Sequence, residues 1–423
     1  MIWPFHKSLR SSLSISSFCS SAAAPCSEYP AMAADGRKQT VILGWGSGED
    51  GQLGMEDWEG RDSACVIKSE SFKDVSAVVA GSRNSLAICH DGTLFTWGWN
   101  QRGTLGHAPE AKTESVPGPV EELSDVMITQ AAIGGWHCLA VDDLGRVYAW
   151  GGNEYGQCGK EPDRTKEGRY LRRDIVIPQR CAPQLSVRQV DAGGTHSLVL
   201  TTDGHVWTWG QPWPPGDINQ IWTPIKVQGL EKVHSIAVGA FHNLALQESG
   251  MLWAWGSNEY GQLGIGDTQP RSQPVLVQTL PDLTLATISA GGWHSAALTD
   301  DGEVYAWGRG EHGRLGLGED KSSKMLPQKV QLLEGEHIIQ VSCGGSHSVA
   351  LTRDGRMFSY GRGDDGRLGN NGKLTNGHPM EVSINVAPPK IDGATAVIGQ
   401  WRAQYIACGG RHTIAIATWS DCR

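Results

Sequence analysis

The sequence predicts an all-β, seven-bladed β-propeller of four-stranded antiparallel blades, in which the N- and C-terminal strands share one blade. Three observations lead to this prediction: an aromatic-Gly pair occurs seven times, a histidine-type motif occurs seven times, and the two series are out of step. The chain begins with an aromatic-Gly pair and ends with a histidine motif. A closed ring explains the offset, because the last half-repeat can then pair with the first.

The aromatic-Gly pairs recur every 46 to 59 residues, a period typical of propeller blades rather than of a β-helix or a horseshoe. The pairs are Trp45-Gly46, Trp97-Gly98, Trp150-Gly151, Trp209-Gly210, Trp255-Gly256, Trp307-Gly308 and Tyr360-Gly361. We expect these aromatic rings to be buried between blades. A closed ring also leaves only short, protected strand edges. We therefore expect residues 41–45 to pair with residues 411–418.

Within one repeat, two short apolar segments flank Asp301-Gly302, and Asp-Gly recurs at 91–92, 203–204 and 354–355. Asp-Gly between two strand-like segments is a strong hairpin signal, and it predicts a type I′ turn. Segments such as 274–278 and 287–290 supply the other two strands of a blade.

The histidine series comprises His137, His196, His242, His294, His347 and His412, with Asn84 in the first position. Six copies related by the repeat indicate a structural role, because a catalytic base is needed only once. We expect each histidine to form a hydrogen bond with a neighbouring loop. Three Gly-x-Gly-x-x-Gly matches, beginning at Gly46, Gly308 and Gly361, are interpreted as turns, since no helical pattern follows them.

Composition limits the function classes. The net charge of -9 argues against a chain-wide nucleic-acid footprint, and no apolar stretch is long enough for a membrane helix. The ten cysteines form no CxxC pair and no disulfide framework, which suits a reducing compartment. We expect no cofactor, no metal and no catalytic residues.

Three regions are predicted: a tail at 1–38, a propeller at 39–419 and a C-terminal end at 420–423. The tail is rich in serine and poor in acids. It fits a transit peptide or a disordered segment, and Met32 is an alternative start. The predicted location is the cytoplasm or nucleus, or else a mitochondrion or chloroplast if residues 1–31 direct import.

The repeated units Gly-Gly-x-His-Ser-x-Ala-Leu, Asp-Gly-x-Val-Tyr-x-Trp-Gly and Gly-Gln-Leu-Gly resemble the repeats of the regulator of chromosome condensation family, over about residues 40–419. The resemblance implies a seven-bladed propeller. The family includes an exchange factor for the GTPase Ran, a plant UV-B photoreceptor and many scaffolds, so it does not settle the function. The photoreceptor's Trp position here holds glycine or alanine, and Trp136 and Trp293 are shifted by one residue. In a strand such a shift reverses the side-chain direction, which argues against the same photochemistry.

Positions that depart from the repeat are the candidates for function. The residue before each histidine position varies, and ring closure places these residues around the axis: Arg83, Trp136, Thr195, Phe241, Trp293, Ser346 and Arg411. Trp and Arg are enriched in binding hot spots. The loops after the aromatic-Gly pairs carry Glu49, Glu154, Glu259, Glu311 and Asp364. By the resemblance they lie on the same face, which predicts an acidic rim for a basic partner segment.

Two further departures are an insert and a shortened repeat. The insert at 160–188 is locally basic, with Arg164, Arg169, Arg172 and Arg173, and it fits either an acidic or phosphate-bearing partner or a solvated loop. Residues 211–222 lack the Gly-Gln-Leu-Gly segment, and Trp213 and Trp222 there would mark an interface if exposed.

The sequence therefore predicts a non-enzymatic scaffold that binds a protein through one face, with Arg83, Trp136, Phe241, Trp293 and Arg411 as its main residues. The alternative is a guanine-nucleotide exchange factor for a small GTPase, and a UV-B receptor-like homodimer is the third hypothesis.

Overall fold

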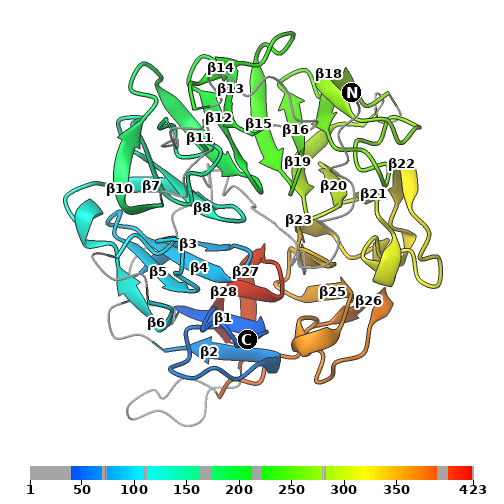
Figure 1. Ribbon diagram of the computed structural model, residues 1–423. Helices are drawn as coiled ribbons and strands as arrows, with labels where there is room; N and C mark the ends of the chain where they lie inside the picture. Colours follow the sequence, from blue (N-terminus) through cyan, green and yellow to red (C-terminus); the bar gives the residue numbers. More distant parts are fainter. Residues whose placement is uncertain are drawn as a thin grey trace, which may run out of the picture.

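The computed structural model describes residues 40–68, 72, 74–107, 112–161, 174–211, 222–278, 280, 283–387 and 399–421. These residues form seven four-stranded antiparallel sheets that follow one another around a central axis (Figure 1). The seven-bladed propeller predicted from the repeat is thus confirmed. In this part of the chain, no helix is long and apolar enough to cross a membrane.

We number the blades from the first complete one. Blade 1 contains β3 (Val75–Ala80), β4 (Asn84–Cys89), β5 (Leu94–Gly98) and β6 (Glu114–Pro119); blade 2 contains β7 (Ile128–Ile133), β8 (His137–Asp142), β9 (Val147–Gly151) and β10 (Ile175–Cys181); blade 3 contains β11 (Val187–Ala192), β12 (His196–Thr201), β13 (Val206–Gly210) and β14 (Ile225–Lys226); blade 4 contains β15 (Val233–Val238), β16 (His242–Gln247), β17 (Leu252–Gly256) and β18 (Arg271–Leu276).

Blade 5 contains β19 (Leu285–Ala290), β20 (His294–Thr299), β21 (Val304–Gly308) and β22 (Lys324–Lys329); blade 6 contains β23 (Ile338–Cys343), β24 (His347–Thr352), β25 (Met357–Gly361) and β26 (Asn376–Glu381). Blade 7 is composite, with the strand order β2 (Arg61–Ile67), β1 (Thr40–Gly46), β28 (His412–Asp421) and β27 (Gly399–Cys408). The first strands of neighbouring blades contact one another, so they line the axis.

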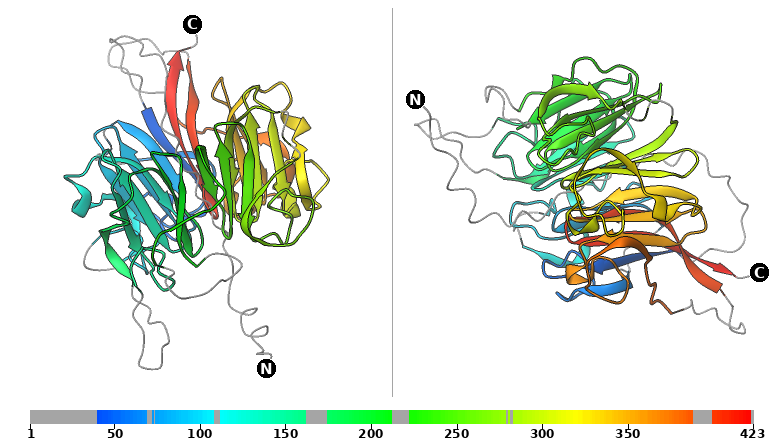
Figure 2. Two further views of the ribbon diagram at one scale, coloured as in Figure 1. Left: turned by 90° about the horizontal axis from the view of Figure 1, so that it is seen from above. Right: turned by 90° about the vertical axis from the view of Figure 1, so that its right-hand side faces the viewer.

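The ring closes as the offset of the two series predicts. Strand β1 pairs with β28 over seven residues, from Thr40 opposite Thr418 to Gly46 opposite His412. The last hairpin, β27–β28, is longer than those of the other blades and extends beyond them at one face (Figure 2). Strand β28 continues to Asp421, two residues past the boundary expected for the propeller.

Three glutamine side chains join the inner strands of neighbouring blades. Gln130, Gln189 and Gln340 each accept a hydrogen bond from a backbone N–H of the next inner strand and donate one back to a carbonyl there. These paired bonds imitate a β-ladder where the diverging strands cannot pair directly. They provide hydrogen-bond partners for backbone polar groups around the axis, which would cost free energy if they were buried without partners.

The turn type expected at Asp-Gly is wrong. In blade 1 the Gly92 N–H donates to the Cys89 carbonyl, and Gly92 has a φ of 82°. The φ of Asp91 is not positive. A type I′ turn needs a positive φ at both of its central positions. The geometry instead fits a type I turn followed by a left-handed glycine. The aspartate and glycine occupy the third and fourth turn positions rather than the two central ones.

The repeated aromatic rings are buried, as predicted, and most also form a hydrogen bond between blades. The Trp97 Nε1–H donates to the Gln52 carbonyl of the preceding blade, and Trp209 and Trp307 do the same with Gln157 and Gln262, each at 2.9 Å. In these three blades, the backbone carbonyl of the glutamine in or aligned with Gly-Gln-Leu-Gly is the acceptor for the indole N–H of the next blade.

The histidines join the blades through a two-bond chain. The His412 Nε2 lies 2.8 Å from the Ser85 hydroxyl of blade 1, and that hydroxyl donates to the Gln52 carbonyl. Because the hydroxyl proton is used there, Nε2 must carry the histidine proton. The same Nε2 contact at 2.8 Å occurs for His137, His196, His242, His294 and His347 with Ser197, Asn243, Ser295, Ser348 and Thr413.

The joint between blades 1 and 2 departs from this pattern on both sides at once. Asn84 replaces the histidine, and Cys138 replaces the hydroxyl residue that would face it. The Asn84 Nδ2 has no hydrogen-bond partner in the described part of the chain, while the Cys138 thiol donates to the Thr104 carbonyl. The two replacements are coupled because each removes the other's partner.

Replacing one interblade indole should therefore destabilise the whole ring. We expect Trp307→Ala to lower the unfolding free energy by about 3–5 kcal/mol, because it leaves a large cavity and also removes the bond to Gln262. Trp58→Ala is the matched control, since Trp58 is 50 % exposed, and it should have little effect. Urea unfolding monitored by circular dichroism measures both. Equal losses for the two variants would contradict this role.

Candidate functional site: the loop face

Two sets of loops emerge at the same face of the propeller. In each blade the start of the second strand pairs with the end of the third, as in His137 opposite Gly151 and His294 opposite Gly308. The turn before the histidine position and the loop after the aromatic-Gly pair therefore lie together. Backbone bonds join them, for example from the Trp99 N–H to the Arg83 carbonyl at 3.0 Å. We call this side of the molecule the loop face.

The seven variable residues before the histidine positions surround the axis on the loop face. Backbone hydrogen bonds connect neighbouring turns, including Gly410 N–H to the Gly81 carbonyl and Gly345 N–H to the Gly409 carbonyl. These bonds make Arg411 and Arg83 neighbours across the point of closure. Most of the seven side chains are half-buried. They therefore present part of their surface to solvent.

One sector of the loop face is a stack of arginines and tryptophans. The Arg83 guanidinium lies 5.1 Å from the Trp99 ring centroid, the Trp99 and Trp136 centroids are 5.5 Å apart, and the Arg102 guanidinium lies 5.5 Å from the Trp136 centroid. Trp99 was missed by sequence reasoning. It occupies a position that holds Ser47, Gly152 and Ser257 in three other blades and Gln211, Arg309 and Arg362 in the remaining three, so an aromatic residue there departs from the repeat and was an available signal.

A second aromatic group lies at blades 4 and 5. The Trp293 ring contacts Phe241 at 5.7 Å and Tyr260 at 5.5 Å, measured between centroids. The Arg309 guanidinium lies 4.6 Å from the Tyr260 centroid. Trp136 and Trp293 both lie in bends before their strands, not within them. The premise of the expected reversal, that both residues lie within extended strands, is therefore wrong.

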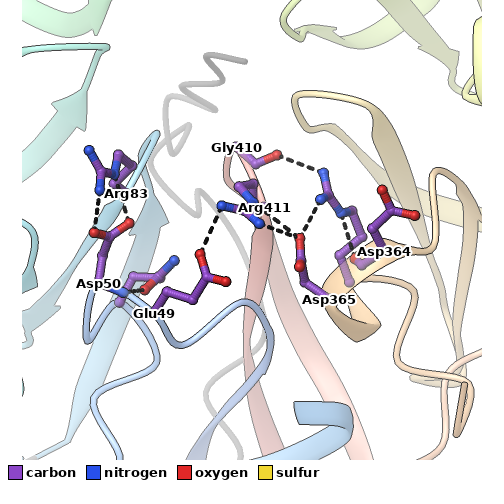
Figure 3. Close-up of polar contacts among 9 residues, drawn as sticks. Glu49, Asp50, Arg83, Asp364, Asp365, Gly410 and Arg411 are labelled. Atoms are coloured by element: carbon purple, nitrogen blue, oxygen red, sulfur yellow. Dashed lines mark hydrogen bonds and ion pairs between the residues drawn. The ribbon is translucent and has the colours of Figure 1, made fainter. Parts of the chain in front are cut away.

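At the point of closure, arginines and carboxylates alternate (Figure 3). Asp50 accepts hydrogen bonds from both Nε and Nη2 of Arg83. Arg411 lies between two carboxylates, with Nε 3.1 Å from Asp365 and Nη1 3.1 Å from Glu49. Asp365 also accepts from the buried Arg367 at 2.7 Å. The structure thus brings Arg83, Arg411 and Glu49 together, but each guanidinium is already held by a carboxylate.

The predicted acidic rim is largely neutralised by arginines of the same face. Glu49 contacts Arg411, Glu154 contacts Arg102 at 3.4 Å, Glu311 contacts Arg309, and Asp364 contacts Arg362 at 2.6 Å. Among the five predicted acids, Glu259 alone has no ion pair within the described residues. The five acids do reach the surface of the face, but four of them are paired with arginines, so whether they bind a basic segment stays a prediction. The sequence could not show this pairing, because most of the partnering arginines were outside the predicted set.

The other candidate sites are only partly visible. Arg164, Arg169, Arg172 and Arg173 of the basic insert, and Trp213 of the shortened repeat, lie outside the described residues. Trp222 is half-buried, with its backbone against Gly156. The missing Gly-Gln-Leu-Gly segment coincides with a two-residue outer strand, β14.

A family model for the RCC1-like domain matches residues 41–415. The chain belongs to the RCC1-like domain family. It is 32 % identical over 340 residues to the ultraviolet-B receptor UVR8 of Arabidopsis thaliana, covering 78 % of this chain and 74 % of UVR8. It is also 32 % identical over 396 residues to human E3 ubiquitin-protein ligase HERC2, which covers 89 % of this chain but only 8 % of that protein.

A mitochondrial member of the RCC1 family is similar as well. RUG3 of Arabidopsis thaliana is 32 % identical over 332 residues, which cover 77 % of this chain and 62 % of RUG3. Among solved structures, Prp20p of Saccharomyces cerevisiae has a TM-score of 0.76 at 22 % identity, covering 91 % of this chain and 93 % of Prp20p. That likeness shows the fold alone. The relatives of this chain thus carry names as different as receptor and ubiquitin ligase.

Proposed function

We propose that this RCC1-like propeller is a non-enzymatic scaffold that binds a protein partner through the loop face. The supporting observation is the pair of half-buried arginine–aromatic groups around the axis, centred on Trp136 and Trp293. Tryptophan and arginine are enriched in binding hot spots. Neither side chain takes part in the repeated histidine and indole hydrogen bonds between blades, and both remain half-exposed.

The test is a comparison of partner binding by matched variants of the full chain. We expect the double variant Trp136→Ala with Trp293→Ala to lose partner proteins that the wild type captures, by at least about tenfold. The control is Leu144→Ala with Met251→Ala, because these exposed side chains lie in hairpin turns of the opposite face. Identical partner sets for wild type and the tryptophan variant would overturn the proposal.

Exchange activity on a small GTPase is the alternative. Its support is the fold shared with Prp20p, whose structure was described together with binding to Gsp1p and histones. Nucleotide release from a labelled GTPase separates the two functions. Acceleration that is lost in Trp136→Ala with Arg411→Ala would favour exchange over scaffolding.

A UV-B-responsive homodimer is the third hypothesis. It is motivated by the identity to UVR8 and by the Arg83, Trp99, Trp136 and Arg102 stack. Size-exclusion chromatography before and after UV-B illumination tests it directly. A change of oligomeric state with light would support it, and a constant state would exclude it.

A further inference from the structure

Blades 5 and 6 carry an arginine where three other blades carry glutamine. The position after the loop turn holds Gln52, Gln157 and Gln262, whose side-chain oxygens each accept a bond from a backbone N–H of their own loop. The side chains of Arg314 and Arg367 instead extend to the turn before the histidine position of the next blade. The Arg314 Nη1 donates to the Gly345 carbonyl at 3.0 Å, and the Arg367 Nη1 donates to the Gly410 carbonyl at 3.4 Å.

The two arginines differ in how their charge is balanced. Arg367 has the Asp365 carboxylate at 2.7 Å. Arg314 bonds only to the Glu311 and Gly345 carbonyls, and within the described residues no carboxylate lies at ion-pair distance from it. Arg314 is nevertheless only 2 % exposed, and burial lowers its pKa to about 9. Buried charges are normally paired, because an uncompensated buried ion costs several kcal/mol.

The surrounding charges do not supply the missing anion. Glu311 is engaged by Arg309, and Asp364 is engaged by Arg362 through both Nε and Nη2. Among these five residues, three cations face two carboxylates. Burial lowers the pKa of the adjacent His312, and although Glu311 opposes this, Arg314, Arg362 and Arg309 add to it. Positive charge is therefore in excess at this junction of blades 5 and 6, within a chain of net charge -9.

The arginines also retain free hydrogen-bond donors. Arg362 uses Nε and Nη2 on Asp364, and Arg309 uses Nη2 on Glu311, so the Nη1 groups of both have no partner within the described residues. Both side chains are half-exposed on the loop face. Guanidinium groups already fixed by one carboxylate lose little further entropy when they bind another.

We infer that Arg309, Arg314 and Arg362 form a receptor for a carboxylate side chain of the protein partner. This inference rests on the proposed binding function of the loop face, and it replaces a basic partner segment with an acidic one at this sector. The partner's carboxylate would accept hydrogen bonds from the exposed guanidiniums and compensate the buried one beneath them. The aromatic groups would supply the apolar part of the same interface.

The test uses a fluorescent, N-acetylated hexaglutamate peptide with the full chain at low ionic strength. We expect the wild type to bind it and Arg314→Gln to bind it at least about tenfold more weakly. Glutamine is already present at this position in three other blades, so this variant should fold. Arg362→Gln is the second variant and should weaken binding too. Arg353→Gln is the matched control, because it removes one exposed arginine charge from the opposite face.

A second readout follows from the buried charge. Without peptide, Arg314→Gln should melt at a higher temperature than the wild type, whereas Arg353→Gln should not change the melting temperature. Peptide should raise the melting temperatures of the wild type and of Arg353→Gln, and it should raise that of Arg314→Gln much less. Equal peptide affinity of wild type and Arg314→Gln, or tight binding of inorganic phosphate without binding of the peptide, would overturn the inference. Partner capture that still depends on Trp136 and Trp293 would then leave the proposed function standing.

Discussion

Deleting residues 40–46 should abolish cooperative folding of the propeller. The deletion removes Ile42, Leu43 and Trp45, which are almost fully buried, and with them about 5–9 kcal/mol of apolar burial. It also leaves β28 without its ladder partner and separates β2 from the blade. Folded domains have unfolding free energies of only about 5–15 kcal/mol. The lost burial energy is therefore comparable to the whole unfolding free energy of the protein. Thermal unfolding monitored by circular dichroism measures the effect.

A circular permutant is the matched control for this deletion. Joining Asp421 to Thr40 through a short Gly-Ser linker and starting the chain at Asp74 keeps every strand and makes blade 7 contiguous. Thr40 lies opposite Thr418, so a short connection suffices. We expect the permutant to retain a cooperative transition. A deletion variant that melts at the wild-type temperature would show that ring closure does not hold the domain together.

Mild acid should unfold the protein through its buried histidines. Burial lowers the pKa of His137, His242 and His412 to about 3. The positive charge of His196 lowers the pKa of His137 and His242 further, and that of Arg367 lowers the pKa of His412 further. Burial also lowers the pKa of His196, against its bond to Asn243. The pKa values of His294 and His347 lie well below the ordinary range, chiefly through burial and then through Arg314 and Arg367 respectively. All six are neutral in the fold, and their Nδ1 atoms have no partner in the described part of the chain.

The sign of the effect follows from proton uptake. The unfolded chain binds a proton at each histidine near pH 6.5, whereas the folded chain does not, so stability is complete above that pH and falls as the pH decreases below it. Each histidine contributes about 1.4 kcal/mol per pH unit once its unfolded form is protonated. Six give a slope approaching ~8 kcal/mol per pH unit. Most carboxylates titrate below pH 5, so the histidines dominate the dependence between pH 5 and 6.5. Burial raises the pKa of Asp191 well above its ordinary range, and this one carboxyl opposes the histidines.

Urea unfolding midpoints between pH 5 and 7.5 measure this dependence. Replacing one buried histidine, as in His137→Gln, should reduce the slope by about one proton, since glutamine can still donate to Ser197. His234→Gln is the control because His234 is exposed, and it should leave the slope unchanged. A midpoint that stays constant from pH 7.5 to 5 would mean that these histidines are not held neutral by the fold.

How far the sequence could predict the candidate site depends on the kind of residue. The ring of residues before the histidine positions followed from the repeat and from closure, so Arg83, Trp136 and Arg411 could be placed on one face. Asp50 and Asp365 could not be assigned as their partners, because they come from loops of the neighbouring blade and contact them only in three dimensions. The acidic rim was predicted from acids alone, which ignored the arginines that neutralise it.

The sequence by itself determined the architecture: the repeat period sets the number of blades, and the offset of its two motifs determines that the ring closes through β1 and β28. These features are local or periodic, so they can be read along the chain. Only the tertiary structure decided the electrostatics of the loop face, where Arg411 is paired and Arg314 is not. The reason is physical. Whether a buried charge has an opposite charge beside it depends on which loops of adjacent blades meet, and the distance between two such loops cannot be read from the residue spacing within either loop.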